Sequence, residues 1–138
     1  MTYSIEKNEQ YALIRLAESE LSEAMATDFE TLNKGFFREG YTNVIADLST
    51  VQTISPEGMM AIRKINRHCT NEEGLLVLVT KNEPLIELLD KAGGSDLTIL
   101  PTVEEAVDAV FMNELENDFR SEDDDEYNAG GGFGISAE

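Results

Sequence analysis

The stretch that decides the fold of this chain is Asn43-Val44-Ile45-Ala46-Asp47-Leu48-Ser49-Thr50-Val51-Gln52-Thr53-Ile54-Ser55-Pro56-Glu57-Gly58. Its first six residues form a short, mostly apolar run rich in branched side chains, which is typical of a buried strand. Ser55 suits the N-cap of a helix, Pro56 suits the first helical position, and Glu57 complements the positive end of the helix dipole. The stretch therefore predicts a strand, a loop over residues 49–54, and then a helix.

The same alternation continues toward the C-terminus. The helix that begins after Ser55 keeps one apolar face, and a second apolar strand is predicted over residues 74–80. A further helix starts at residues 82–84 and stops at Gly93, a last short strand covers residues 97–100, and Thr102 with Glu105 forms a capping box that opens another helix. From residue 43 the order is β-α-β-α-β-α, and right-handed crossovers of this kind predict a parallel sheet with helices packed on it.

The N-terminal part predicts a hairpin followed by a helix. Residues 3–7 and 11–16 read as two strands joined by a short polar turn. Between residues 21 and 38, apolar side chains recur every three or four positions, Ser22 can cap the helix start, and Gly40 suits a left-handed end. We expect one α/β domain over residues 1–117, with a mixed sheet that has a parallel core and an N-terminal hairpin.

Charge is distributed unevenly along the chain. Of 138 residues, 28 are acidic and 10 are basic, a formal net charge of −18. Residues 118–138 combine a block of acids with a run of glycines, a composition that buries too little apolar surface to offset the entropy of ordering, so we expect a disordered tail. The negative field of the chain repels phosphate backbones and anionic lipids, so nucleic acid is excluded as a partner. No apolar run is long enough to insert into a membrane.

Side chains that could support catalysis or bind a metal are scarce. Cys69 and His68 are the only residues of their types, and as helix neighbours they point in different directions, so they form neither a nucleophile–base pair nor a zinc site. The acidic block in residues 121–126 fits no register of a calcium-binding loop. The sequence predicts no enzyme activity, no metal and no cofactor. The single cysteine and the absence of an N-terminal secretion signal predict a cytoplasmic protein.

The ordered set of segments resembles the STAS domain family, the anti-sigma-factor antagonists and their relatives. The resemblance rests on the strand ending in Asp47-Leu48-Ser49, the loop, an apolar residue and the helix opening at Gly58, and on later segments including Leu88-Leu89-Asp90-Lys91-Ala92-Gly93. It covers about residues 3–115. It implies a STAS fold, and it implies regulation through binding to another protein, such as a kinase-type anti-sigma factor.

The helix start departs from the family pattern of Asp-Ser-Ser/Thr-Gly. Alignment on Gly58 places Ser55 at the aspartate, Pro56 at the serine that a partner kinase phosphorylates in the family, and Glu57 at the second hydroxyl residue. Because proline has no hydroxyl, the family's phosphorylation switch is absent, and Ser55 is a displaced candidate. Read without the resemblance, the same residues are simply a well-capped helix start.

These observations predict a non-catalytic, protein-binding regulatory module. The expected partner-binding residues surround the start of the helix: Ser49, Thr53, Ser55, Pro56, Glu57, Gly58, Met59 and Met60. An alternative is a structural STAS subunit of a lipid- or anion-transport assembly, which the missing serine favours. A receiver-type phosphoacceptor domain would need paired acids after the first strand and a lysine after a late strand, and the sequence has Asn8 and Pro101 at the corresponding points.

Overall fold

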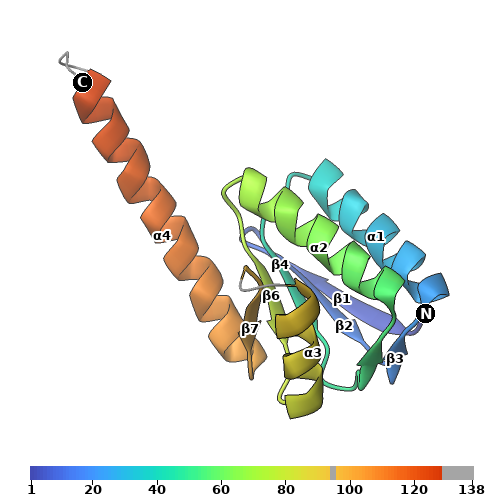
Figure 1. Cartoon of the computed structure of the whole chain (residues 1–138). Coiled ribbons are helices and arrows are strands. Elements are labelled where there is room, and N and C mark those ends of the chain that lie inside the picture. Colours follow the sequence, from blue (N-terminus) through green and yellow to red (C-terminus); the bar gives the residue numbers. More distant parts are fainter. Residues whose placement is uncertain (94–95, 129–138) are drawn as a thin grey trace.

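The computed structural model describes residues 1–93 and 96–128 as a five-stranded sheet with helices on both faces (Figure 1). The strands of this sheet are β1 (Tyr3–Lys7), β2 (Ala12–Leu16), β4 (Val44–Asp47), β6 (Leu76–Val79) and β7 (Thr98–Leu100). They lie in the order β1-β2-β4-β6-β7. β1 pairs with β2 in antiparallel fashion, and every other neighbouring pair is parallel. The predicted mixed sheet, with its N-terminal hairpin, is therefore confirmed.

Four helices connect and cover the strands. They are α1 (Glu23–Arg38), α2 (Pro56–Asn71), α3 (Glu83–Gly93) and α4 (Val103–Asn128). One group of buried side chains joins α1, α2 and α3 to one face of the sheet, and Phe29 is the largest of its fully buried members. A second, smaller group joins α4 to the opposite face through Ala106 and Val110. None of the described helices is long and apolar enough to cross a membrane.

The predicted helix caps are confirmed. The Ser22 side chain accepts a hydrogen bond from Met25 N, and the Thr102 hydroxyl accepts one from Glu105 N at 3.1 Å. Gly40 follows α1 with a φ of 99°, the left-handed conformation that glycine adopts without strain. Each cap depends on residues within four positions of one another, which explains why the sequence alone reveals it.

Two features differ from the sequence-based prediction. The segment expected to be a loop contains β5 (Thr53–Ile54), which pairs in parallel with β3 (Glu20–Leu21) as a separate two-stranded sheet. Helix α4 continues past Asn117, the expected domain boundary, as far as Asn128, and the disorder expected for residues 118–138 stays a prediction. The reason is that residues 103–128 contain no glycine or proline and include many glutamates, which are good helix formers. The rest of the expected disordered tail, residues 129–138, lies outside the described residues.

Asn43, just before β4, links three parts of the fold. Its side-chain Nδ2 donates to Gln10 O at 3.0 Å and to a Glu114 carboxylate oxygen at 2.9 Å, and its Oδ1 accepts from Leu75 N at 3.0 Å. Asn43 is buried, so these bonds replace contacts with water that the amide has lost. The hairpin turn, the start of β6 and helix α4 are therefore held to one another at this residue.

Candidate functional site

The start of α2 is built as the sequence predicts. Ser55 has extended backbone angles (φ −71°, ψ 162°), and its Oγ accepts a hydrogen bond from Gly58 N at 3.0 Å. Pro56 occupies the first turn, where its missing N–H costs no helical hydrogen bond. The Ser55 backbone N–H donates to Leu21 O at 2.9 Å, which ties the helix start to the small β3–β5 sheet. The position and direction of α2 are therefore set by contacts on both sides of its N-cap.

The eight expected partner-binding residues fall into two groups. Ser49, Thr53, Pro56, Glu57 and Met60 are exposed, and Ser55 is half-buried. Gly58 and Met59 are buried, so they support the surface from beneath.

Gly58 is a position of close packing. A Cβ at this residue would lie 2.8 Å from Ile54 Cγ2 and 3.0 Å from Leu21 O. Glycine is needed here because α2 crosses the small β3–β5 sheet too closely for a side chain.

Met59 and Met60 have opposite environments. The Met59 side chain lies in the core between the helices and the sheet, whereas Met60 is 57% exposed. An exposed methionine offers a flexible and polarisable apolar contact for a partner. Of the two methionines that sequence analysis placed in the site, only Met60 is available at the surface.

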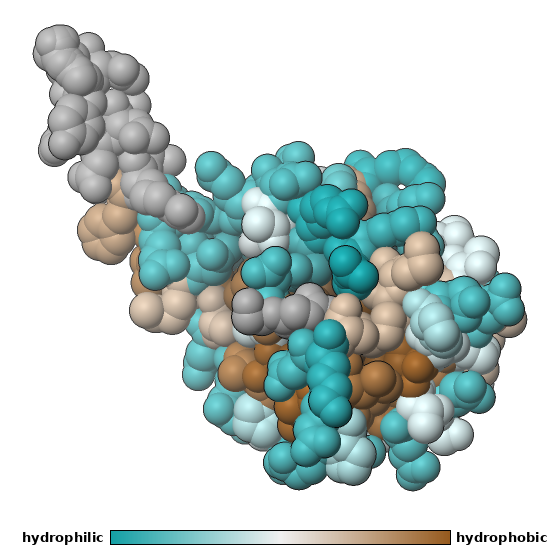
Figure 2. Space-filling model, viewed as in Figure 1, coloured by the Kyte–Doolittle hydropathy of each residue, from teal (hydrophilic) through white to brown (hydrophobic). Residues whose placement is uncertain are grey.

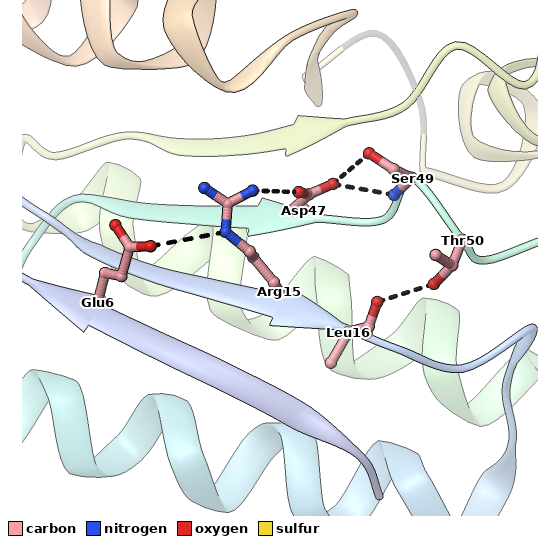
Figure 3. A network of polar contacts seen from close by, with 6 residues as sticks. All are labelled: Glu6, Arg15, Leu16, Asp47, Ser49 and Thr50. Atoms are coloured by element: carbon pink, nitrogen blue, oxygen red, sulfur yellow. Dashed lines mark hydrogen bonds and ion pairs between the residues drawn. The ribbon is translucent and has the colours of Figure 1, made fainter.

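A polar network fixes the loop that leads into α2 (Figure 3). Asp47, at the end of β4, accepts hydrogen bonds from the backbone N–H of Ser49 at 3.0 Å and from the Ser49 hydroxyl. The other Asp47 carboxylate oxygen lies 3.0 Å from Nη1 of Arg15 on β2, and Arg15 Nε lies 3.7 Å from a Glu6 carboxylate oxygen on β1. The nearly buried carboxylate is thus compensated by an opposite charge and by two donors.

Thr50 adds a second attachment for this loop, because its hydroxyl donates to Leu16 O at 2.8 Å (Figure 3). The sequence alone points to Ser49 in this region but not to Arg15, Glu6 or Thr50. The one available signal was a charged residue, Arg15, within the apolar run of its strand. Arg15 and Asp47, like Thr50 and Leu16, lie more than 30 positions apart in sequence, so no local pattern pairs them.

Cys69 and His68, the only cysteine and the only histidine of the sequence, have different environments. Cys69 is fully buried, and burial raises the pKa of its thiol to about 12, so the nucleophilic thiolate is not formed at neutral pH. His68 is exposed and stacks on Phe37, with ring centroids 3.8 Å apart. Among the residues that the structure describes, no three His, Cys, Asp or Glu side chains are grouped as metal ligands.

Comparison with solved structures shows the fold to be that of anti-sigma factor antagonists. An anti-sigma factor antagonist from Mycobacterium paratuberculosis is 20% identical, with 79% of this chain and 92% of that chain covered and a TM-score of 0.64. The Bacillus cell fate determinant SpoIIAA in its phosphorylated form is 18% identical, with 79% and 99% covered and a TM-score of 0.62. No curated protein sequence matches the chain.

A domain of a membrane transporter has a similar fold. The murine Solute Carrier 26 family member A9 anion transporter is 15% identical, with a TM-score of 0.56. The match covers 78% of this chain but only 18% of the transporter chain.

The sequence of this chain also matches a protein-family model, that of the STAS domain. The match covers residues 3–106, about three quarters of the sequence. On this match, and with the sheet order and helix arrangement described above, the chain belongs to the STAS domain family.

Proposed function

We propose that this protein is a non-catalytic regulatory module that binds a partner protein in the cytosol through the surface at the start of α2. This α2-start surface consists of Ser49, Thr53, Pro56, Glu57 and Met60. The single observation that carries the proposal is that these residues are all exposed near a helix start whose geometry is fixed, since Ser55 caps the helix and Asp47 anchors the loop. A surface held in one geometry loses little conformational entropy when a partner binds.

We further propose that binding does not depend on phosphorylation of this chain. Pro56 has no hydroxyl, and the Ser55 hydroxyl is half-buried and already serves as the helix cap. Glu57 supplies a permanent negative charge in the first turn, where it is also stabilised by the helix dipole. Phosphate at a docking surface would add roughly −1.5 to −2 charges and repel a partner that fits the unmodified surface. The partner therefore remains bound whether or not a kinase is active.

The partner surface is tested by co-purification from the cells in which the protein occurs. The partner recovered with the wild-type chain is expected to be lost with Met60→Glu, because a charge replaces an exposed apolar contact of the surface. Leu88→Glu is the control, since Leu88 is also an exposed apolar residue of a helix, α3, and belongs to neither proposed surface. Loss of the partner with Leu88→Glu and retention with Met60→Glu would show that the α2-start surface is the wrong one.

The absence of a phosphorylation switch is tested with the recovered complex. After incubation with ATP, intact-mass measurement is expected to show no phosphate on the chain, and the affinity for the partner is expected to stay unchanged. The reverse variant, Pro56→Ser, restores a hydroxyl at the family position and is expected to accept phosphate if the partner is a kinase. Phosphate on Ser55 of the wild-type chain, with loss of binding, would contradict the proposal.

A second candidate function is a structural subunit of a lipid- or anion-transport assembly. The observation that favours it is again Pro56, because a permanent subunit needs no phosphorylation cycle. The co-purification experiment separates the two functions. Recovery of an ATP-binding anti-sigma factor supports the regulatory role, and recovery of a transporter ATPase supports the structural role.

A further inference from the structure

Over residues 103–119, where its side chains are described, helix α4 contacts the rest of the fold along one side. Ala106 and Val110 are fully buried against the face of the sheet opposite to α1, α2 and α3. Further along the same side, Asn113 and Asn117 donate side-chain hydrogen bonds to Glu73 O at 3.0 and 2.6 Å. The inward side of α4 is therefore defined by contacts as far as Asn117.

The outward side of α4 carries an apolar stripe. It consists of Phe111, Met112, Leu115 and Phe119, which are 44%, 59%, 52% and 66% exposed. At about 100° per residue these four side chains share one arc of the helix, opposite the side that contacts the sheet. Figure 2 shows apolar side chains on this exposed length of α4, ahead of the grey residues. We call these four residues the α4 outer stripe.

The α4 outer stripe is surrounded by negative charge. Residues 103–119 contain six acids and no basic residue: Glu104, Glu105, Asp108, Glu114, Glu116 and Asp118. The Glu114 carboxylate accepts a hydrogen bond from Asn43 on the inward side of the helix, and the other five acids are exposed. Within the described part of the chain, none of these six carboxylates forms an ion pair. A clustered apolar patch of this kind marks an interaction surface, and unpaired acids around it favour a partner with positive charge.

We propose that the α4 outer stripe binds a basic amphipathic helix of another protein. The apolar residues at positions 111, 115 and 119 repeat every four residues along a helix, so they pair with a helix whose apolar face has the same spacing. Lysine and arginine beside that apolar face would meet the acids of α4. The α4 outer stripe lies on the opposite side of the sheet from α2, which carries the α2-start surface. The basic helix and the partner of the α2-start surface can therefore bind at the same time.

The charge pattern disfavours a second copy of α4 as the occupant. Two α4 helices packed along their outer stripes would bring together the exposed acids that each helix carries beside its stripe. Like charges placed opposite one another in an interface are repelled and cost affinity. A basic helix neutralises the same carboxylates.

The test uses the full chain and a synthetic helical peptide of about 18 residues built from leucine and lysine, with leucine on one face. The control is a peptide of the same composition in which the leucines are scrambled around the helix. We expect the amphipathic peptide to bind at least tenfold more tightly than the scrambled one in calorimetric titration. The double variant Leu115→Ser/Phe119→Ser should weaken its binding at least tenfold, and Met60→Ser should change it less than twofold.

Three results would overturn the proposal. Equal affinity for the two peptides, or unchanged affinity in the double variant, would show that negative charge alone attracts the peptide. A concentration-dependent dimer that the double variant abolishes would show that a second copy covers the stripe, through α4 or through the basic α2 residues Arg63, Lys64 and Arg67. Circular dichroism checks that the double variant is folded, as expected from the exposure of both residues.

Discussion

Replacement of Gly74 by alanine is expected to destabilise the fold by about 3 kcal/mol, at the upper end of the usual cost of overpacking. A Cβ on Gly74 would overlap the Thr42 carbonyl oxygen and would lie 2.8 Å from Thr42 Cβ. The obstacle is mainly backbone, so no side-chain rotation can relieve it. The free energy of unfolding, measured by urea denaturation, tests this expectation.

The close approach at Gly74 follows from the way that α2 ends. Gly74 N donates to Cys69 O at 2.7 Å and Glu73 N donates to Thr70 O at 3.0 Å, the pair of bonds that defines a Schellman motif. Glu73 occupies the left-handed position with a φ of 63°. The chain then turns directly into β6 beside the segment that enters β4, and the two backbones nearly touch.

Gly35→Ala is the matched control for Gly74→Ala. Gly35 lies within α1, and a Cβ there would meet nothing within 4 Å. Because alanine is the better helix former by about 1 kcal/mol, this variant is expected to be more stable than the wild type. Equal effects of the two substitutions would contradict the packing argument.

Replacement of Phe29 by alanine is expected to cost about 3–5 kcal/mol, the usual range for an aromatic residue removed from a core. Phe29 is fully buried among the side chains that join α1 and α2 to the sheet. Removing the ring leaves a cavity that the rigid strands behind it cannot fill. The loss is a large part of the roughly 5–15 kcal/mol that stabilises a typical domain, so the variant should be partly unfolded well below the wild-type melting temperature.

Phe119→Ala is the control for Phe29→Ala, because it removes the same side chain from an exposed position instead of a buried one. Phe119 is the most exposed of the large apolar residues among the described side chains of α4, residues 103–119. Its removal is expected to change the free energy of unfolding by less than about 0.5 kcal/mol, as for surface substitutions in general. A loss comparable to that of Phe29→Ala would mean that the α4 outer stripe contributes to folding rather than to binding.

Local sequence accounts for most of the fold. The caps at Ser22, Ser55 and Thr102 and the left-handed Gly40 each involve residues within four positions, so their chemistry can be read directly from the chain. The period of the apolar residues places the helices and strands. The alternation after residue 43 then leaves few topologies other than a parallel sheet.

The tertiary structure alone decided which of the site residues are available to a partner. Met59 and Met60 are adjacent and identical in type, yet one is buried and the other exposed, because only the packing of α2 on the sheet distinguishes them. The Arg15–Asp47 ion pair and the pairing of β3 with β5 join residues more than 30 positions apart. The outward direction of the α4 outer stripe likewise depends on where α4 meets the sheet. Sequence periodicity describes neighbours along one element, whereas these features arise from contacts between elements, which form only when the chain has folded.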